Sequence, residues 1–259
     1  MSLHLLAGDG ALLALDGDYD ILAALEALWQ PFTAADGAGS SDVEHVVVRD
    51  LAEASAVVNR TLVARLQWPA VHAAVVEIGG GAVAVPAVSG AGKSTLSAAL
   101  CCAGAGYLSD EALVLDDAPV TDEAYEGPVS ALPYPKPVAL SRWSARAVGL
   151  SEARGVDGEQ LLDGDRELLF PAAALGGPCK AVPILNVLLP RRTSGPPRLE
   201  RVPRIDGLRA LIDLSFNHYR DPVRFLLAAA ATVRGADVHV LEIGEPMATA
   251  RLVHESFKP

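Results

Sequence analysis

Residues 87–94, with the sequence AVSGAGKS, have the types and spacing of a Walker A phosphate-binding loop. They match G-x-x-x-x-G-K-[ST] except at the first position, where Ala87 replaces Gly. In such a loop, glycines let backbone N–H groups approach phosphate oxygens, the lysine neutralises the β- and γ-phosphates, and the hydroxyl can ligate Mg²⁺. A strand-like run precedes the motif, and apolar residues at helical spacing follow it. The alternative is a Gly/Ser turn with an incidental lysine.

The motif predicts which residues bind the nucleotide phosphates. They are Ser89, Gly90, Ala91, Gly92, Lys93, Ser94 and Thr95. The motif leaves the reaction open, because ATPases, GTPases and kinases all use a loop of this kind.

A second group with chemical potential is the acidic pair Asp110-Glu111, which follows the predicted loop and helix. A P-loop enzyme needs a carboxylate beside Mg²⁺ and, if it is a kinase, a base for the acceptor hydroxyl. Between Lys93 and Lys136 the chain has seven acidic residues and no lysine or arginine. The acids at 116–117 and 122–123 lie among Pro and Thr and are interpreted as a solvated turn. A surface turn is also the alternative for Asp110-Glu111.

The order of these features resembles the catalytic domain of HPr kinase/phosphorylase. His72 is followed by a strand, a Gly turn, a second strand, S-G-x-G-K-S, a short helix and an acidic pair. The similar stretch covers residues 71–115, and a looser likeness continues through 133–137 and 215–219. That looser pattern is typical of short HPr-kinase-like proteins, some of which phosphorylate a precursor in peptide natural-product pathways such as those of lasso peptides. The resemblance implies a P-loop core related to phosphoenolpyruvate carboxykinases.

The resemblance also implies roles for individual residues. Lys93 matches the phosphate-binding lysine and Ser94 the metal-ligating hydroxyl. Asp110 matches the acid that resembles the general base, and Glu111 stands where the family has an Asp that serves Mg²⁺ directly or through water. His72 matches a histidine near the phosphate site, although it could equally be a hydrogen-bonded residue at a strand start. The family's long Gly-rich segment downstream of the acids is not found, which argues against phosphorolysis and against HPr as the acceptor.

Several other polar residues are weaker candidates. Lys136 stands in a stiff P-Y-P-K-P frame that could present a cation to a phosphate or carboxylate, although a lone lysine is more often solvated. Six arginines at 191–209 could bind an acidic peptide, but a solvated connection is the favoured interpretation. We expect His218 and Arg220 to cap helix carbonyls. The tryptophans are interpreted as packing residues: Trp29, Trp68 and Trp143.

Composition narrows the class of protein. The chain has 259 residues, of which 51% are hydrophobic, so it can bury a large core. It has 32 acidic and 21 basic residues, and this net charge of −11 argues against nucleic-acid or anionic-membrane binding. Its three cysteines have neither zinc-site nor disulfide-framework spacing, which fits a reducing compartment. Because neither a signal peptide nor a transmembrane segment is found, we expect a cytoplasmic protein, which could form a homo-oligomer.

The hydrophobic pattern predicts an α/β fold with two parts. A strand pair at 3–15, helices at 19–29 and 50–66 and a strand at 45–48 predict a small N-terminal α+β region over residues 1–68. Residues 69–259 are predicted to form the P-loop kinase core. Its expected elements are strands at 71–78, 82–88, 182–189 and 238–243, a mixed turn and strand run at 107–115, an extended segment at 133–137, and helices at 94–104, 206–218 and 222–233.

Together these features predict an ATP- and Mg²⁺-dependent kinase. It would transfer the γ-phosphoryl group to a hydroxyl, either of a Ser/Thr in a peptide or protein or of a small molecule. The alternative is a P-loop nucleotide-binding or regulatory ATPase module without such transfer, which would show no acceptor-dependent ADP release. A carboxykinase-like enzyme would need a cation cluster for its acidic substrate, and the sequence shows no clear cluster near the loop.

Overall fold

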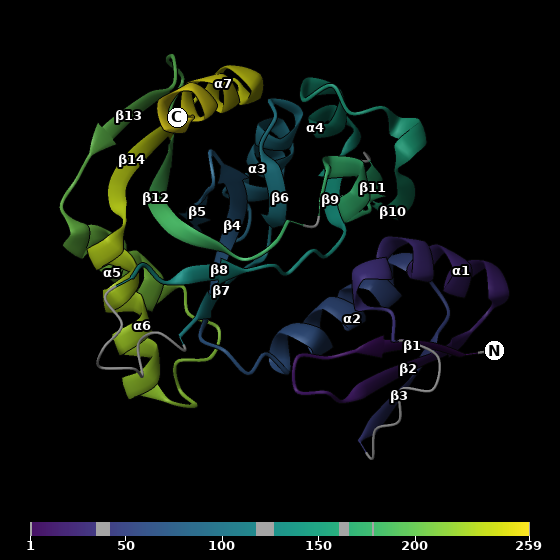
Figure 1. The fold of residues 1–259 in the computed structure, drawn as a ribbon. Helices are drawn as coiled ribbons and strands as arrows, with labels where there is room; N and C mark the ends of the chain where they lie inside the picture. The colour runs from purple at the N-terminus through teal and green to yellow at the C-terminus, as the bar shows by residue number, and fades with distance from the viewer. Residues whose placement is uncertain (1, 35–41, 118–126, 161–165, 178, 259) are drawn as a thin grey trace.

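The computed structural model describes residues 2–34, 42–117, 127–160, 166–177 and 179–258. Its largest element is an eight-stranded mixed sheet in the order β13-β14-β12-β5-β4-β7-β8, with β6 paired to β4. The strands are β4 (Ala70–Ile78), β5 (Gly81–Pro86), β6 (Gly106–Ser109), β7 (Ala112–Asp116), β8 (Ser130–Leu132), β12 (Val182–Arg192), β13 (Arg198–Arg201) and β14 (Asp237–Ile243). The mixed α/β fold predicted from the sequence is therefore present (Figure 1).

Strand β12 holds the sheet together because it pairs with three neighbours. It runs parallel to β14 through residues 186–192 and parallel to β5 from Ile184. Its first residue, Val182, instead pairs antiparallel with Ala131 of β8. The sheet therefore curves back on itself, and β12 sweeps from β14 to β8 (Figure 1).

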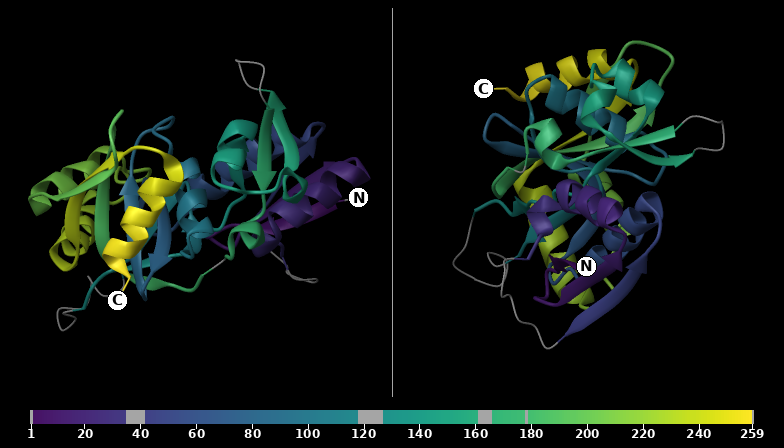
Figure 2. Two further views of the ribbon diagram at one scale, coloured as in Figure 1. Left: turned by 90° about the horizontal axis from the view of Figure 1, so that it is seen from above. Right: turned by 90° about the vertical axis from the view of Figure 1, so that its right-hand side faces the viewer.

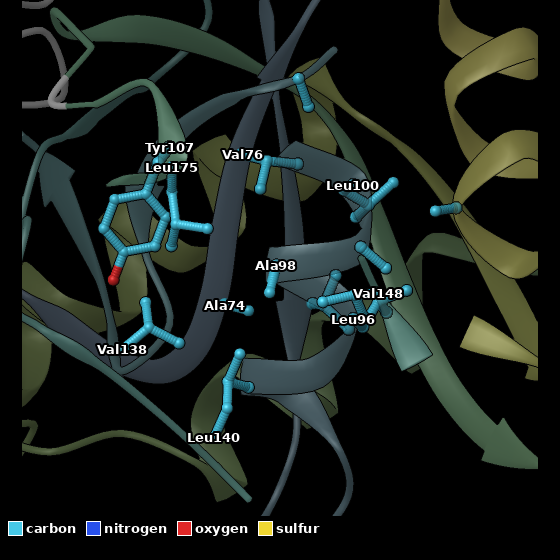
Figure 3. Packing of buried hydrophobic residues seen from close by; sticks show 14 of the residues in the cluster. Ala74, Val76, Leu96, Ala98, Leu100, Tyr107, Val138, Leu140, Val148 and Leu175 are labelled. Carbon is cyan, nitrogen blue, oxygen red and sulfur yellow. The ribbon is translucent and has the colours of Figure 1, made fainter. Parts of the chain in front are cut away.

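Helices cover both faces of this sheet. Successive side chains of β4 point to opposite faces, and apolar ones on both faces need to be covered. Val76 belongs to a buried cluster that includes α3 (Lys93–Cys102) and α7 (Pro246–Phe257). Val75, one residue earlier, belongs to a second cluster with α5 (Arg204–Asp213) and α6 (Pro222–Gly235). Figure 3 shows the first of these clusters, in which side chains of the strands meet those of α3.

A three-stranded sheet beside α3 completes that first cluster. Its order is β10-β11-β9. It consists of β9 (Val138–Ser141), β10 (Val156–Gln160) and β11 (Arg166–Phe170), and α4 (Arg142–Ala147) follows β9. The sequence pattern predicts none of these elements, nor α7. The strands and α4 are too short to develop a clear period.

The N-terminal elements form their own sheet and helix pair. They are β1 (Ser2–Leu6), β2 (Leu12–Gly17), α1 (Tyr19–Leu28), β3 (Val43–Val48) and α2 (Leu51–Ala64), and they lie together at one end of the molecule (Figures 1 and 2). Their buried cluster also contains Ala70, Ala112, Val114, Tyr134 and Leu169. Because buried residues from both sides of 68/69 share this cluster, the domain boundary there stays a prediction.

Most predicted elements are confirmed, with altered ends. The second predicted strand ends at Pro86 rather than 88, because the phosphate-loop candidate begins there. The helix predicted to reach 218 ends at Asp213, since 215–220 turns back toward the N-terminal region. Among the described residues, no helix is both long and apolar enough to cross a bilayer.

The predicted solvated acidic turn is partly wrong. Asp117 is buried, and its Oδ1 lies 2.9 Å from Nη2 of Arg224 on α6. This pairing offsets the cost of burying the carboxylate. Residues 122 and 123 lie outside the described residues.

Residues 215–220 fasten the connection between α2 and β4. The Asn217 side chain accepts from the N–H of Ala70 at 3.0 Å and donates to the carbonyl of Trp68 at 2.8 Å. Arg220 donates to the carbonyls of Ala64 and Leu66, so it caps the end of α2 rather than the end of the helix that precedes it in sequence. The expectation for the neighbouring His218 is not met, because its ring packs beside Phe225 instead.

Replacing Asn217 should destabilise the protein. Asn217→Ala leaves two partly buried backbone groups without partners, so the free energy of unfolding should fall by about 1–3 kcal/mol. Asn217→Asp, which keeps the acceptor and loses the donor, should give a smaller loss. The control is Val223→Ala at a 69% exposed position. Urea denaturation measures all three, and an Asn217→Ala variant as stable as the control would contradict this role.

Candidate functional site

The predicted phosphate loop occupies the turn between β5 and α3. Gly90 and Gly92 have φ angles of 77° and 95°, in the region that favours glycine. Gly92 immediately precedes Lys93, the first residue of the helix. The arrangement of strand, Gly-containing loop and helix N-terminus is the context that the motif requires.

The Lys93 side chain folds back onto this loop. Its ammonium donates to the carbonyl oxygens of Ala87 at 2.9 Å and Val88 at 3.1 Å. Burial lowers the pKa of Lys93, while the negative charges of Glu111 and Asp110 act in the opposite direction. The loop cation and the acidic pair therefore belong to one electrostatic cluster, although 17 and 18 positions separate them in sequence.

The acidic pair lies in the turn between β6 and β7. The backbone holds this turn on β4, where the N–H of Ala73 donates to the Glu111 carbonyl at 3.0 Å. The Ser109 hydroxyl accepts from the N–H groups of Glu111 and Ala112 at 3.1 and 2.9 Å. Asp110 is only 2% exposed, so the surface-turn interpretation does not describe it.

Lys136 is the partner of the buried Asp110. Its Nζ lies 2.9 Å from Asp110 Oδ1, and the Tyr107 hydroxyl donates to the same oxygen at 3.0 Å. Nζ also donates to the carbonyl of Pro137 at 2.9 Å. With 8% exposure, Lys136 is not the solvated lysine that the sequence favoured. The long lysine-free, acid-rich run before it was the available signal, because a buried acid in that run needs a cation from outside it.

His72, on β4, completes the cluster beside Glu111. Its Nε2 lies 3.7 Å from Glu111 Oε1, and its ring packs against Phe216. Burial and the nearby positive charge of Lys93 lower the pKa of His72 to about 4. The imidazole is therefore neutral at pH 7. Burial raises the pKa of Glu111, with Asp110 adding to the effect and both lysines opposing it.

The remaining loop residues contact other elements of the core. Ser89 and Gly90 are exposed, and Ala91 and Ser94 are half-buried. The Thr95 hydroxyl donates to the hydroxyl of Ser144 at 3.1 Å. Arg192, at the end of β12, donates to the Gly90 carbonyl at 2.9 Å. Arg192 is thus a loop contact that sequence reasoning treated only as one of a group of solvated arginines.

The oxygen donors near the loop suit Mg²⁺. Among the described residues, no three or more His, Cys, Asp or Glu side chains gather in a way that could hold a metal by themselves. Mg²⁺ in nucleotide sites usually takes one or two protein oxygens and completes its shell with phosphates and water. Ser94 and Glu111 are residues of that hard-oxygen type, so the predicted ligands fit the ion.

Two pockets border the residues described above. A pocket of about 240 Å³ lies against the loop. Its lining residues are Ala91, Gly92, Thr95, Leu96, Trp143, Arg192, Thr193, Ile243, Gly244 and Pro246. A second pocket, of about 140 Å³, borders Lys136. Its other lining residues are Trp29, Ala52, Ser55, Ala56, Asn59, Pro137, Ala139, Glu167 and Leu169.

No protein-family model matches the sequence, and a search of curated proteins finds no match either.

The low pKa of His72 predicts how stability changes in acid. In the unfolded chain this histidine takes up a proton near pH 6.5, whereas in the folded protein it stays neutral down to about pH 4. The unfolded state therefore binds more protons between these values, and stability falls as the pH falls. Relative to His72→Gln, the wild type should lose about 1–2 kcal/mol between pH 7 and pH 5.

Urea denaturation of both proteins at the two pH values makes this comparison. Subtracting the variant removes the contribution of Glu111, whose raised pKa acts in the opposite direction. An equal pH dependence in the two proteins would show that His72 is not kept neutral by the fold.

Proposed function

We propose that this protein is an ATP- and Mg²⁺-dependent kinase that transfers a γ-phosphoryl group to a hydroxyl. The observation that carries the proposal is the cluster formed by the buried residues Lys93, Asp110 and Lys136 together with the half-buried Glu111. A phosphoryl-transfer site needs cations for the phosphate charge and a carboxylate near the attacking hydroxyl. The resemblance of residues 71–115 to the HPr kinase/phosphorylase catalytic domain supports the same assignment.

The loop would bind the phosphates of ATP. Backbone N–H groups from Ser89 to Thr95 would face phosphate oxygens, and the N-terminus of α3 adds its partial positive charge. Lys93 would exchange its two carbonyl acceptors, Ala87 and Val88, for the β- and γ-phosphates. This exchange replaces neutral acceptors by charged ones, which strengthens the hydrogen bonds of the ammonium.

Asp110 would accept the proton of the acceptor hydroxyl. In the free protein its carboxylate is bonded to Tyr107 and Lys136. A γ-phosphate near this cluster would compete for the Lys136 ammonium, and release of one Asp110 oxygen would make it available as a base. The deprotonated hydroxyl would then attack the γ-phosphorus as the bond to the β-phosphate oxygen breaks, giving a phosphate ester and ADP.

Ser94 and Glu111 would hold Mg²⁺. When bound, the ion would neutralise charge on the β- and γ-phosphate oxygens. Glu is one methylene longer than the family's Asp, so Glu111 would reach the ion directly or through a water. Because His72 is neutral, its imidazole would not compete with Mg²⁺ for the negative charge of the neighbouring Glu111 carboxylate.

The acceptor would be a Ser/Thr of a peptide or protein, or a small alcohol. The likeness to short HPr-kinase-like proteins favours the peptide precursor of a natural product. The acceptor would bind in the pocket that borders Lys136, where residues of α2 in the N-terminal region would contact it. Cytoplasmic location and a homo-oligomeric state remain expectations from the sequence.

The second candidate is a nucleotide-binding or regulatory ATPase module. The observation in its favour is that Asp110 already has two partners, Tyr107 and Lys136, and would serve as a purely structural ion pair. Acceptor-dependent release of ADP separates the two functions, because a module would release ADP at the same rate with and without hydroxyl compounds.

Removing the loop cation tests nucleotide binding. Lys93→Ala should weaken Mg·ATP binding or turnover at least tenfold, about 1.4 kcal/mol, because the phosphates lose their buried cation. Arg209→Ala is a control that removes a positive charge from a side chain 71% exposed. Calorimetric titration showing the same ATP affinity and turnover for Lys93→Ala as for the control would remove the phosphate-loop assignment.

Substituting Asp110 and substituting Glu111 should change the kinetics in different ways. Asp110→Asn keeps the shape, removes the base and should lower kcat about 10²-fold or more while ATP still binds. Glu111→Gln should instead raise the Mg²⁺ concentration needed for half-maximal rate. A Mg²⁺ titration of both variants decides, since an exchange of the two effects would reverse the roles. If neither variant changes turnover or metal requirement, the pair has no catalytic function.

A further inference from the structure

The pocket of about 240 Å³ is continuous with the phosphate loop, and the proposed chemistry does not use it. It is bordered by Gly92 and Thr95 at the start of α3 and by Arg192 and Thr193 at the end of β12. The end of β14 and the segment after it add Ile243, Gly244 and Pro246. Asp110, Glu111, His72 and Lys136 are not among its lining residues. It therefore adjoins the helix side of the loop, away from the buried cluster.

The path of a bound nucleotide would lead into this pocket. Lys93 reaches back to the first residues of the loop and shares its electrostatic environment with the acids, so the terminal phosphates belong at that end. The rest of the nucleotide must continue toward the other end of the loop, where Gly92 and Thr95 line the pocket. A nucleoside is the part of ATP that needs an apolar, concave surface with a few polar groups.

Trp143 provides an unusual wall for the pocket. A packing role was expected for it from the sequence, but the residue is 65% exposed. The short helix α4 that carries it is fixed at its start, where the Ser141 hydroxyl accepts from the N–H of Ser144 at 3.0 Å. Arg142 and Arg146 on either side both pair with Glu152.

These contacts place an exposed indole beside the loop on a restrained element. Exposing a large aromatic surface to water has a cost that packing does not offset at this position. Arg192 also lines the pocket and is fixed by its bond to the Gly90 carbonyl. A planar guanidinium and an indole are both groups on which a nucleobase can stack.

We infer that this pocket binds the base and ribose of the nucleotide, with Trp143 stacking on the base. The inference rests on the proposed function, because it concerns the same nucleotide. It adds a residue, Trp143, that belongs neither to the loop motif nor to the acidic pair. Stacking on an indole tolerates any base, so the contribution of Trp143 is expected for ATP and GTP alike.

Calorimetry with two probes tests the inference. The probes are Mg·ATP and Mg·tripolyphosphate, which carries three linked phosphates and has no nucleoside. The proteins are the wild type, Trp143→Ala, Trp143→Phe and, as a control at an exposed aromatic distant in sequence, Tyr219→Ala. Trp143→Ala should weaken Mg·ATP binding about tenfold or more and leave tripolyphosphate binding unchanged. Trp143→Phe should recover part of the ATP affinity, and Tyr219→Ala should bind both probes like the wild type.

The outcomes separate this inference from the proposed function. If the wild type binds both probes and Trp143→Ala binds ATP with unchanged affinity, the nucleoside site is wrong while the phosphate loop stands. The same conclusion follows if Trp143→Ala impairs only acceptor-dependent turnover, because the pocket would then hold the acceptor. If the wild type binds neither probe, the proposed function fails and this inference fails with it.

Discussion

Asp110, Lys93 and Lys136 carry their charges on residues that are only 2%, 7% and 8% exposed. An unpaired charge at such a position would cost several kcal/mol. Asp110 is paired with Lys136 from another segment, and Lys93 is bonded to two carbonyls of its own loop with the acids nearby. The acid comes from the turn between β6 and β7, one lysine from the start of α3, and the other from the extended segment before β9. Neutralising this charge within one cluster therefore requires these three elements to be held in fixed positions.

The free loop also satisfies its cations internally. Lys93 is bonded to two loop carbonyls, and Arg192 is bonded to a third, that of Gly90. These bonds give a buried ammonium the acceptors that phosphate oxygens would otherwise provide. A bound nucleotide would therefore replace hydrogen bonds that Lys93 and Arg192 already make. Its affinity would reflect only the difference in free energy between the phosphate bonds formed and the carbonyl bonds lost.

The parts of the site that the sequence predicted are those encoded locally. Between a strand and a helix, the Gly-x-Gly-Lys-Ser run favours a loop whose glycines have positive φ angles. Gly90 and Gly92 have such angles in the structure. The acidic pair was expected near the loop from the family resemblance, and in the structure β6 and β7, which flank the pair, both pair with β4. Its burial and its pairing with Lys136 were not predicted, since they depend on the tertiary packing of a segment 26 positions away.

The short elements that the sequence missed, β9 to β11 and α4, share the same physical cause. The short strands β9 to β11 acquire their order from pairing with one another, and α4 is held by ion pairs to Glu152. Trp143 is exposed because α4 is held in this position. The sequence pattern does not predict that exposure, since a lone aromatic residue is usually part of the core. The interpretation of Asp117 failed for a similar reason, because its partner Arg224 lies on a helix more than a hundred residues later.

The segment Pro133 to Pro137 links the N-terminal region to the proposed catalytic acid. Tyr134 is buried in the N-terminal cluster, and its hydroxyl donates to Asn59 Oδ1 of α2 at 2.9 Å. Two residues later, Lys136 reaches Asp110. Because the flanking prolines restrict φ, little conformational freedom separates the two contacts. The packing of α2 on Tyr134 thus fixes where the Lys136 ammonium lies, and the N-terminal region acts on the site by positioning this cation.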